Sequence, residues 1–356
     1  MTTTLATRLS YEALPGRVVF GAGTVAEVAA EVARLGGERA LLVDGLFDAV
    51  LVGRIERDLG ERHAATLAEV AQHVPAELAA GALERARACA ADCLVALGGG
   101  SATGVAKAVA KETGLPILAV PTTYAGSEMT PIWGITAAAR KTTGRDLAVL
   151  PRTVVYDPEL TVSLPAAATA ASGMNAVAHC VEALWTPAAN PVTDAVAGEG
   201  IALLAAGLRG AVLDPHDLAS RTLALRGAWL GGTALAVGGT GLHHKLCHVL
   251  GGTFGLPHAE VHAIVLPWVA EHYREAAPEA LDRVARALGA ADAVAGLREL
   301  GRDLGLEAGL ADLGLRPADL ELAADLAAAV APSTPAPAGR EQILTILEQA
   351  MTTERE

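Results

Sequence analysis

The chain has 356 residues, of which 52% are hydrophobic and 3% aromatic, and its formal net charge is −13. This length corresponds to about two domains, and the composition is typical of an α/β protein with a large core and Ala-rich helices. The acidic balance, without any block of Lys and Arg, argues against nucleic acid or an anionic membrane surface as a partner. An anionic ligand would therefore need a local cationic pocket.

The first 160 residues alternate between strand and helix patterns. Expected strands cover 17–20, 39–44, 64–70, 92–97, 115–120 and 153–157, and expected helices cover 25–35, 50–59, 75–89 and 102–112. Thr24 is expected to cap the first helix, and 136–150 is expected to form a charged turn. The alternation predicts a mostly parallel sheet covered on both faces by helices.

After Pro165 the pattern changes to long Ala/Leu-rich segments with helical spacing. Expected helices are 166–185, 191–212, 215–236, 241–250, 261–276, 279–288, 292–303, 317–327 and 340–353. We therefore divide the chain into an α/β nucleotide-binding domain of residues 1–160 and an all-α catalytic domain of residues 161–356. The cleft between two such domains is the expected place for a binding site.

The cysteines and the chain start predict a cytoplasmic protein. The four cysteines have no paired metal-binding spacing and are expected to be reduced (Cys89, Cys93, Cys180 and Cys247). The first eight residues lack the apolar stretch of an export signal. Uncharged runs such as 161–181 contain Pro, Gly, Asn and His, so no membrane span is predicted.

A glycine-rich turn follows the strand expected at 92–97. Gly98, Gly99, Gly100 and Ser101 lie between this strand and the next helix. Glycines let backbone N–H groups approach a phosphate, and a helix N-terminus favours an anion. The turn is not the G-x-G-x-x-G motif, and an ordinary loop is the alternative. Its place at a strand end favours a cofactor pyrophosphate.

Polar residues follow two other strands at the same expected edge of the sheet. Thr122, Thr123 and Ser127 come after the strand at 115–120, and their hydroxyl groups suit a nucleotide base and sugar. Asp44 ends the strand at 39–44, where a carboxylate accepts hydrogen bonds from ribose hydroxyls and repels a 2′-phosphate. An ordinary turn acid is the alternative for Asp44.

Histidines cluster in the second half of the chain. Of the ten histidines, five lie within 243–262 (His243, His244, His248, His258 and His262). His244 and His248 are four residues apart, so a helix presents them on one face. Gly251 and Gly252 are expected to end this helix, and the following loop can return His258 to the same point. Converging imidazoles suit metal binding or proton donation to a carbonyl oxygen, and individually satisfied histidines are the alternative.

A second polar pair lies on the helix expected at 166–185. Asn175 and His179 are one turn apart among apolar residues. A carboxylate at the first position would begin a metal site, but the neutral amide of Asn175 is a poorer ligand for a divalent ion.

Together these stretches resemble the iron-containing (group III) alcohol dehydrogenase family, which is related to dehydroquinate synthase, over nearly the whole chain. The resemblance implies a dinucleotide-binding α/β domain, a helical C-terminal domain, an active site between them, and a homodimer. The phosphate loop of that family matches Gly98 to Ser101, and its adenine-side threonines match Thr122 and Thr123. Its four metal ligands fall on Asn175, His179, His244 and His258.

Two departures from the metal-dependent pattern indicate a particular branch. The ligand Asp is replaced by Asn175, and the acid after the phosphate loop is replaced by Gly104. With the segments 121–128, 141–146 and 243–248, these departures resemble the maleylacetate reductase branch. That resemblance implies reduction of maleylacetate, a small dicarboxylate, to 3-oxoadipate with NADH or NADPH in aromatic-compound degradation, with no metal required.

The residues suggest roles in such a reaction. Hydride addition to the alkene carbon β to the ketone leaves an enolate that must be stabilised and protonated. We expect His244, His248 and His258, with His179 behind them, to surround the enolate oxygen and supply the proton. Lys245 or Arg145 would pair with the carboxylates, Asn175 would hold a histidine tautomer, and Asp44 favours NADH over NADPH. The alternatives are a metal-dependent alcohol or aldehyde dehydrogenase, a lyase of the dehydroquinate synthase kind, and a non-catalytic nucleotide-binding module.

Overall fold

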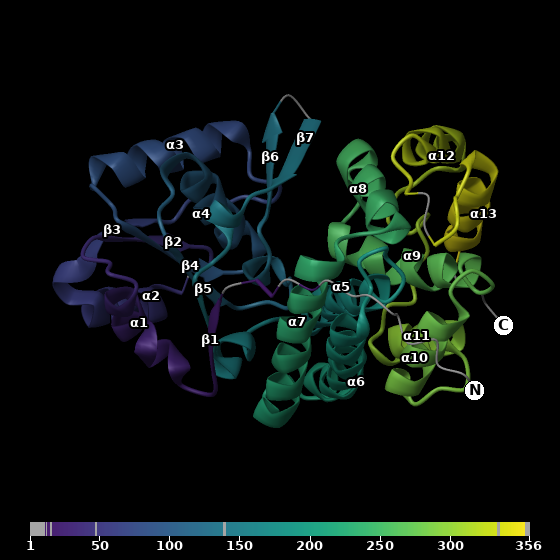
Figure 1. Cartoon of the computed structure of the whole chain (residues 1–356), viewed down its shortest axis with the longest axis horizontal. Helices are drawn as coiled ribbons and strands as arrows, with labels where there is room; N and C mark the ends of the chain where they lie inside the picture. The colour runs from purple at the N-terminus through teal and green to yellow at the C-terminus, as the bar shows by residue number, and fades with distance from the viewer. Residues whose placement is uncertain are drawn as a thin grey trace.

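The chain is divided into an α/β half and a helical half (Figure 1). The structure is a computed structural model that describes residues 11, 13–14, 16–46, 48–137, 140–332 and 335–352, without the side chains of residues 140, 141, 258 and 259. The α/β half runs to the end of strand β8 (Thr153–Tyr156), and the helical half begins with helix α5 (Ala166–Ala183). These two halves have the architecture that the sequence predicts.

The sheet of the α/β half has six parallel strands in the order β1-β8-β5-β4-β2-β3. Its other strands are β1 (Arg17–Phe20), β2 (Ala40–Asp44), β3 (His63–Leu67), β4 (Cys93–Gly98) and β5 (Ile117–Pro121). Because all strands are parallel, their carboxyl ends meet at one edge. The segments after β2, β4 and β5 therefore lie side by side, as the sequence predicts.

Helices cover both faces of this sheet because strand side chains alternate in direction. In β2, Leu41 and Val43 pack with α3 (Ala76–Ala88) and α4 (Gly100–Thr113). Ala40 and Leu42 point the other way and pack with α1 (Val28–Arg34) and α2 (Ala49–Leu59). Figure 1 shows the two pairs of helices on opposite faces.

The start of the first helix differs from the prediction. A 3-10 turn, η1 (Thr24–Glu27), precedes α1, and its N-cap is Gly23 in a left-handed conformation. The Thr24 hydroxyl donates instead to the carbonyl oxygens of Gly21, at 2.8 Å, and Tyr156, at 3.2 Å. Thr24 therefore ties the turn to the sheet and does not cap the helix.

An antiparallel hairpin replaces the charged turn that was expected within 136–150. Its strands β6 (Ile132–Ala137) and β7 (Arg140–Arg145) form a separate two-stranded sheet, which projects toward the side of helix α8 (Figure 1). The Arg145 guanidinium donates to the carbonyl oxygen of Ala236 at 2.7 Å. This contact ties the end of the hairpin to the helical half.

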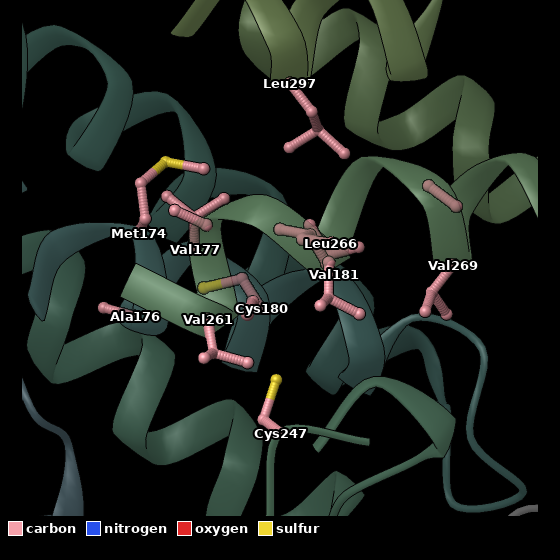
Figure 2. Close-up of a cluster of buried hydrophobic side chains, with 14 of the residues drawn as sticks. Met174, Ala176, Val177, Cys180, Val181, Cys247, Val261, Leu266, Val269 and Leu297 are labelled. Atoms are coloured by element: carbon pink, nitrogen blue, oxygen red, sulfur yellow. The ribbon is translucent and has the colours of Figure 1, made fainter. Parts of the chain in front are cut away.

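The helical half is built around α5, α6 (Pro191–Leu213) and α7 (Leu218–Gly238). The remaining helices are α8 (Leu242–Phe254), α9 (His258–His272), α10 (Pro278–Leu288), α11 (Ala293–Asp303), α12 (Leu320–Ala328) and α13 (Arg340–Ala350). Figure 2 shows the core where α5 meets α8, α9 and α11, which includes Met174, Val181, Cys247 and Leu266. This core holds α5 and α8, the two helices that carry most of the predicted catalytic residues.

Glycine lets α6 and α7 pack closely. A Cβ atom on Gly207 would lie 2.3 Å from the backbone nitrogen of Ala224, so only glycine fits there. Among the described helices, only α6 is long and apolar enough to cross a membrane. Because α6 packs against α5, α7 and α10, its apolarity is also what a core helix requires.

Helix α8 is longer than predicted. Gly251 and Gly252 do not end it; it continues to Phe254 and ends where Gly255 adopts a left-handed conformation, with φ of 69°. Glycines inside a helix are unfavourable but are tolerated where packing holds the segment. Helix α9 then begins at His258, three residues earlier than predicted, and contains Pro267.

Candidate active site

The glycine-rich turn has the geometry of a phosphate site. Gly98 has φ of 135°, and a Cβ there would lie 3.0 Å from the Gly45 backbone. Helix α4 begins with Gly100 and Ser101, and its N-cap residue is Gly99. Because Gly99 has no side chain, it cannot accept a capping hydrogen bond from the first N–H groups of the helix. Such N–H groups have no partner within a helix, and the helix dipole favours an anion beside them.

The threonines and Ser127 lie beside this turn. The backbone N–H of Thr122 donates to the Gly98 carbonyl oxygen at 3.2 Å, which holds the ends of β4 and β5 together. Thr122 and Thr123 line a cavity of about 540 Å³, together with Gly99, Gly100 and Ser101. Ser127 lines a second cavity, described below.

Asp44 lies at the end of β2 and is not among the described residues that line the 540 Å³ cavity. Its side chain is buried, and its Oδ1 accepts a hydrogen bond from the Leu46 backbone at 2.9 Å. The lining residues of this cavity include the next two residues, Gly45 and Leu46. The structure therefore places Asp44 at the expected edge of the sheet and gives its carboxylate a turn-forming contact.

A second cavity, of about 600 Å³, lies between the two halves of the molecule. The two cavities share five lining residues, so they adjoin, and together they are called the groove below (Gln72, Gly100, Ser101, Thr123 and Leu164). Four of the predicted catalytic residues line the 600 Å³ cavity from the helical half (Asn175, His179, His244 and His248). The groove thus leads from the phosphate turn to the histidines.

Glu182 links α5 to α8 at the centre of the histidine cluster. Its Oε1 accepts a hydrogen bond from the His243 backbone at 2.8 Å, and its Oε2 contacts Nδ1 of His244. Burial raises the pKa of the Glu182 carboxyl, while the charge of His243 and the N–H groups of the first turn of α8 act in the opposite direction. The carboxylate therefore fixes the His244 ring with Nδ1 toward α5.

The histidine rings pack against one another. The rings of His179 and His244 are stacked, with centroids 4.9 Å apart, and the ring of His248 lies 6.2 Å from that of His244. Behind them, His243 Nε2 donates to the His262 carbonyl oxygen at 3.0 Å. The predicted convergence of His179, His244 and His248 is thus present, and His243 and His262 support it from the core.

Several predicted residues lie elsewhere or outside the description. Lys245 is on α8 but is not among the described residues that line either cavity, and Arg145 is exposed and bonded to Ala236. His258 begins α9, but its side chain lies outside the described part of the structure. Asn175 was expected to hold a histidine tautomer; at His244, Glu182 is in that position.

Lys107 is a cavity residue that the sequence did not single out. Its ammonium donates to the carbonyl oxygens of Ser127, Thr130 and Ile132 at 2.7, 2.8 and 2.8 Å. Burial lowers the pKa of Lys107 to about 7, although nearby Glu128 acts in the opposite direction. A lone lysine within the apolar run of α4 was the available signal, since buried lysines are rare unless they are paired.

A strained loop lines the cavity from the α/β half. His73 and Val74 have φ of 63° and 45°, and both line the 600 Å³ cavity. A positive φ is uncommon for histidine and exceptional for a β-branched residue. Such strain costs about 1–3 kcal/mol per residue and is concentrated at functional sites.

The donor set at the metal positions of the family fits a divalent ion poorly. Asn175 offers a neutral amide oxygen in place of a carboxylate, and this buried Oδ1 has no hydrogen-bond partner among the described residues. Glu182 contacts Nδ1 of His244, which leaves Nε2 of that ring as the nitrogen that could serve as a ligand. Ring nitrogens of His243, His244 and His262 lie within 4.8 Å of one another, and His243 Nε2 donates to the His262 carbonyl oxygen, so Nδ1 is the nitrogen of His243 that could serve as a ligand there.

Comparison with known proteins covers both halves of the chain. Residues 15–158 match the iron-containing alcohol dehydrogenase family, and residues 169–351 match the C-terminal domain of the Fe-containing alcohol dehydrogenase family. The maleylacetate reductase of Burkholderia cepacia is 47% identical over 340 residues, which are 96% of this chain and 97% of that protein.

Two solved structures superpose on nearly the whole chain. A putative alcohol dehydrogenase from Ralstonia eutropha JMP134 has a TM-score of 0.95 and 49% identity, and the match covers 99% of this chain and 100% of that one. The maleylacetate reductase from Rhizobium sp. strain MTP-10005 has a TM-score of 0.93 and 42% identity, covering 97% of this chain and 98% of that one.

Proposed function

The chain belongs to the iron-containing alcohol dehydrogenase family, and we propose that it reduces the C=C bond of maleylacetate to give 3-oxoadipate, with NAD(P)H as the reductant. The similarity to maleylacetate reductases over nearly the full length supports this substrate and a place in aromatic-compound degradation. The observation that carries the proposal is that the cavity at the phosphate turn adjoins the cavity lined by His179, His244 and His248.

The reaction needs a stabilised oxygen and a proton. NAD(P)H, when bound, would supply the hydride for the alkene carbon that is β to the ketone, and the substrate would then carry an enolate. The enolate oxygen must be stabilised by hydrogen-bond donors, and the α carbon must receive a proton. Imidazoles that line the cavity are suited to both tasks.

His244 is the best-positioned donor for the enolate oxygen. Because Glu182 fixes Nδ1, the other ring nitrogen, Nε2, is the one that can serve a ligand. The carboxylate also stabilises the protonated imidazole, as the acid of a hydrolase triad does. We assign His248 and His179 to the same wall of the cavity, and the amide of Asn175 to a hydrogen bond with the substrate.

We propose that the enzyme works without a metal, because the amide of Asn175 replaces an anionic ligand. The chemistry of the donor set supports this view, since a neutral amide binds divalent ions less well than a carboxylate. A hydrogen-bonding pocket also suits a dianionic substrate. Phosphate-binding N–H groups at Gly100 and Ser101 would hold the coenzyme pyrophosphate, and Asp44 supports NADH over NADPH.

We further propose that the protein is a cytoplasmic homodimer. The four cysteines of the chain are all free thiols, which suits a reducing compartment. Strand β1 forms one edge of the sheet and offers backbone groups for pairing with a second copy. Light scattering coupled to size-exclusion chromatography measures the oligomeric state directly, and a monomer would contradict the proposal.

The test of the proposed function is NADH oxidation followed by absorbance with maleylacetate, beside a panel of simple aldehydes and diols. Rapid turnover of maleylacetate, with 3-oxoadipate as the product, is the expected result. Turnover of the aldehydes or diols in preference to maleylacetate would indicate an alcohol dehydrogenase instead. If NADH fails to raise the melting temperature, every dehydrogenase interpretation is wrong.

A further inference from the structure

The cavity offers few cations for a dianionic substrate. Among the described residues that line it, Lys107 is the only lysine or arginine. Its ammonium is already surrounded by the carbonyl oxygens of Ser127, Thr130 and Ile132. Lys107 therefore connects α4 to the loop before β6, and imidazoles and neutral donors are the remaining groups among the described lining residues that can bind the substrate carboxylates.

His73 is the one imidazole among the described lining residues that comes from the α/β half. The others, His179, His244 and His248, come from α5 and α8 on the opposite wall. In the proposed reaction those three form the wall that faces the ketone oxygen. His73 presents an imidazole to the cavity from the α/β half, on the facing wall.

The loop that carries His73 is held in its left-handed conformation by β6. The Thr136 hydroxyl donates to the His73 carbonyl oxygen at 2.8 Å, and the Thr136 backbone N–H donates to the Val74 carbonyl oxygen at 3.0 Å. Val74 is buried beneath the loop, with 5% of its surface exposed. Neighbouring structure thus imposes a conformation that neither residue favours, which is typical of a functional loop.

Gly104 on α4 provides the space for this loop. A Cβ atom on Gly104 would lie 2.7 Å from Cγ2 of Val74, so any side chain there would push the loop outward. Gly104 also lines the cavity, at the position where the metal-dependent sequence pattern has an acid. Glycine at this position therefore seats the loop and keeps a negative charge away from the anion.

We propose that His73 binds one of the two carboxylates of the substrate, and that Gly104 makes this possible by giving its loop room, so that the pair selects dicarboxylates. This inference rests on the proposed function, because it takes the substrate to be a dianion with its ketone oxygen at the helical wall. It assigns to the loop after β3 a part in specificity. The ligand is a carboxylate of the substrate and not the pyrophosphate of the coenzyme.

The test compares wild type with His73→Asn, since asparagine tolerates a positive φ but lacks the imidazole. His216→Asn, an exposed histidine in the turn between α6 and α7, is the matched control. Competitive inhibition constants are measured for 3-oxoadipate and for two monoacids that each retain one of its carboxylates, levulinate and 3-oxohexanoate. Binding of NADH and the melting temperature are measured alongside.

We expect His73→Asn to raise the inhibition constant of 3-oxoadipate by about tenfold, as loss of a hydrogen bond to a charged group does. The constant of exactly one monoacid should rise with it, and that analogue identifies the carboxylate. NADH binding should not change. Gly104→Ala keeps the imidazole but should raise the same two inhibition constants without changing NADH binding. If Gly104→Ala does not fold, the inhibition constants of His73→Asn decide the test.

An unchanged constant for 3-oxoadipate, equal rises for both monoacids, or a loss of NADH binding alone would each overturn the inference. The last result would assign His73 to the coenzyme. A wild-type chain that does not reduce maleylacetate would refute the proposed function separately. Calorimetric binding of 3-oxoadipate to wild type and His73→Asn would then decide whether His73 binds a carboxylate.

Discussion

Replacing Glu182 with Gln isolates the charge that positions His244. The carboxylate accepts from two donors, the His243 backbone N–H and the Nδ1 of His244, and it is completely buried. The Gln side chain is almost the same size but has one acceptor oxygen and one donor group. Its oxygen can accept from the His243 N–H and its amide N–H can donate to Nδ1 of a neutral His244 ring, but it cannot accept from a protonated Nδ1 and has no charge to stabilise a protonated imidazole.

The expected loss follows from the contacts. Hydrogen bonds to charged groups contribute about 1.5–3 kcal/mol, and neutral ones contribute about 0.5–1.5 kcal/mol. Replacing a charged contact by a neutral or mismatched one should cost about 1–3 kcal/mol in the transition state. This cost corresponds to a fall in kcat of about 5- to 150-fold.

The assay is steady-state reduction of maleylacetate at saturating NADH, with the melting temperature measured in parallel. Because Glu182 does not line the cavity, kcat should fall while the KM for maleylacetate changes little. Glu199→Gln, at an exposed position on α6, is the control and should behave as wild type. A wild-type kcat in a folded Glu182→Gln enzyme would refute the positioning role.

Three further predictions concern stability and coenzyme choice. The Lys107 pKa is about 7 in the folded chain and 10.5 in the unfolded chain. Between pH 7 and pH 10.5 the unfolded state therefore binds more protons than the folded state, and the free energy of unfolding should rise with pH. Chemical denaturation across this range should lose that rise in Lys107→Met, and an unchanged slope would contradict the assignment. Gly207→Ala should lower the free energy of unfolding by about 1–3 kcal/mol or prevent folding, whereas Gly198→Ala, with nothing within 4 Å, should be neutral or slightly stabilising by calorimetry. Asp44→Ala should raise the KM for NADH, so that the KM for NADPH divided by the KM for NADH becomes smaller. If this ratio does not change, Asp44 does not determine the choice of coenzyme.

Periodicity predicted most of the fold because the strands and helices have strong local patterns. The hairpin β6–β7 was missed, since Thr136 to Arg145 is polar and its pairing depends on non-local contacts rather than on an apolar face. The length of α8 was misjudged because Gly251 and Gly252 are usual helix ends. Packing of α8 against α9 overrides that preference.

The site was predictable where residue type and spacing are distinctive. The turn from Gly98 to Ser101 and the pair His244 and His248 are of this kind, and the structure places each beside the groove. Glu182 was missed because a single acid in an apolar helix has no spacing signal, and its role depends on α5 packing against α8. His73 was missed because its backbone conformation depends on a hydrogen bond from Thr136, which is distant in sequence and leaves no local signal.

In the proposed reaction, clustered imidazoles and no metal act on the substrate oxygen. The most direct measurement is kcat/KM for maleylacetate with NADH before and after exhaustive chelation, with metal analysis of the same sample. We predict that the metal-free protein retains full activity. Activity that disappears on chelation and returns with stoichiometric iron or zinc would contradict the account.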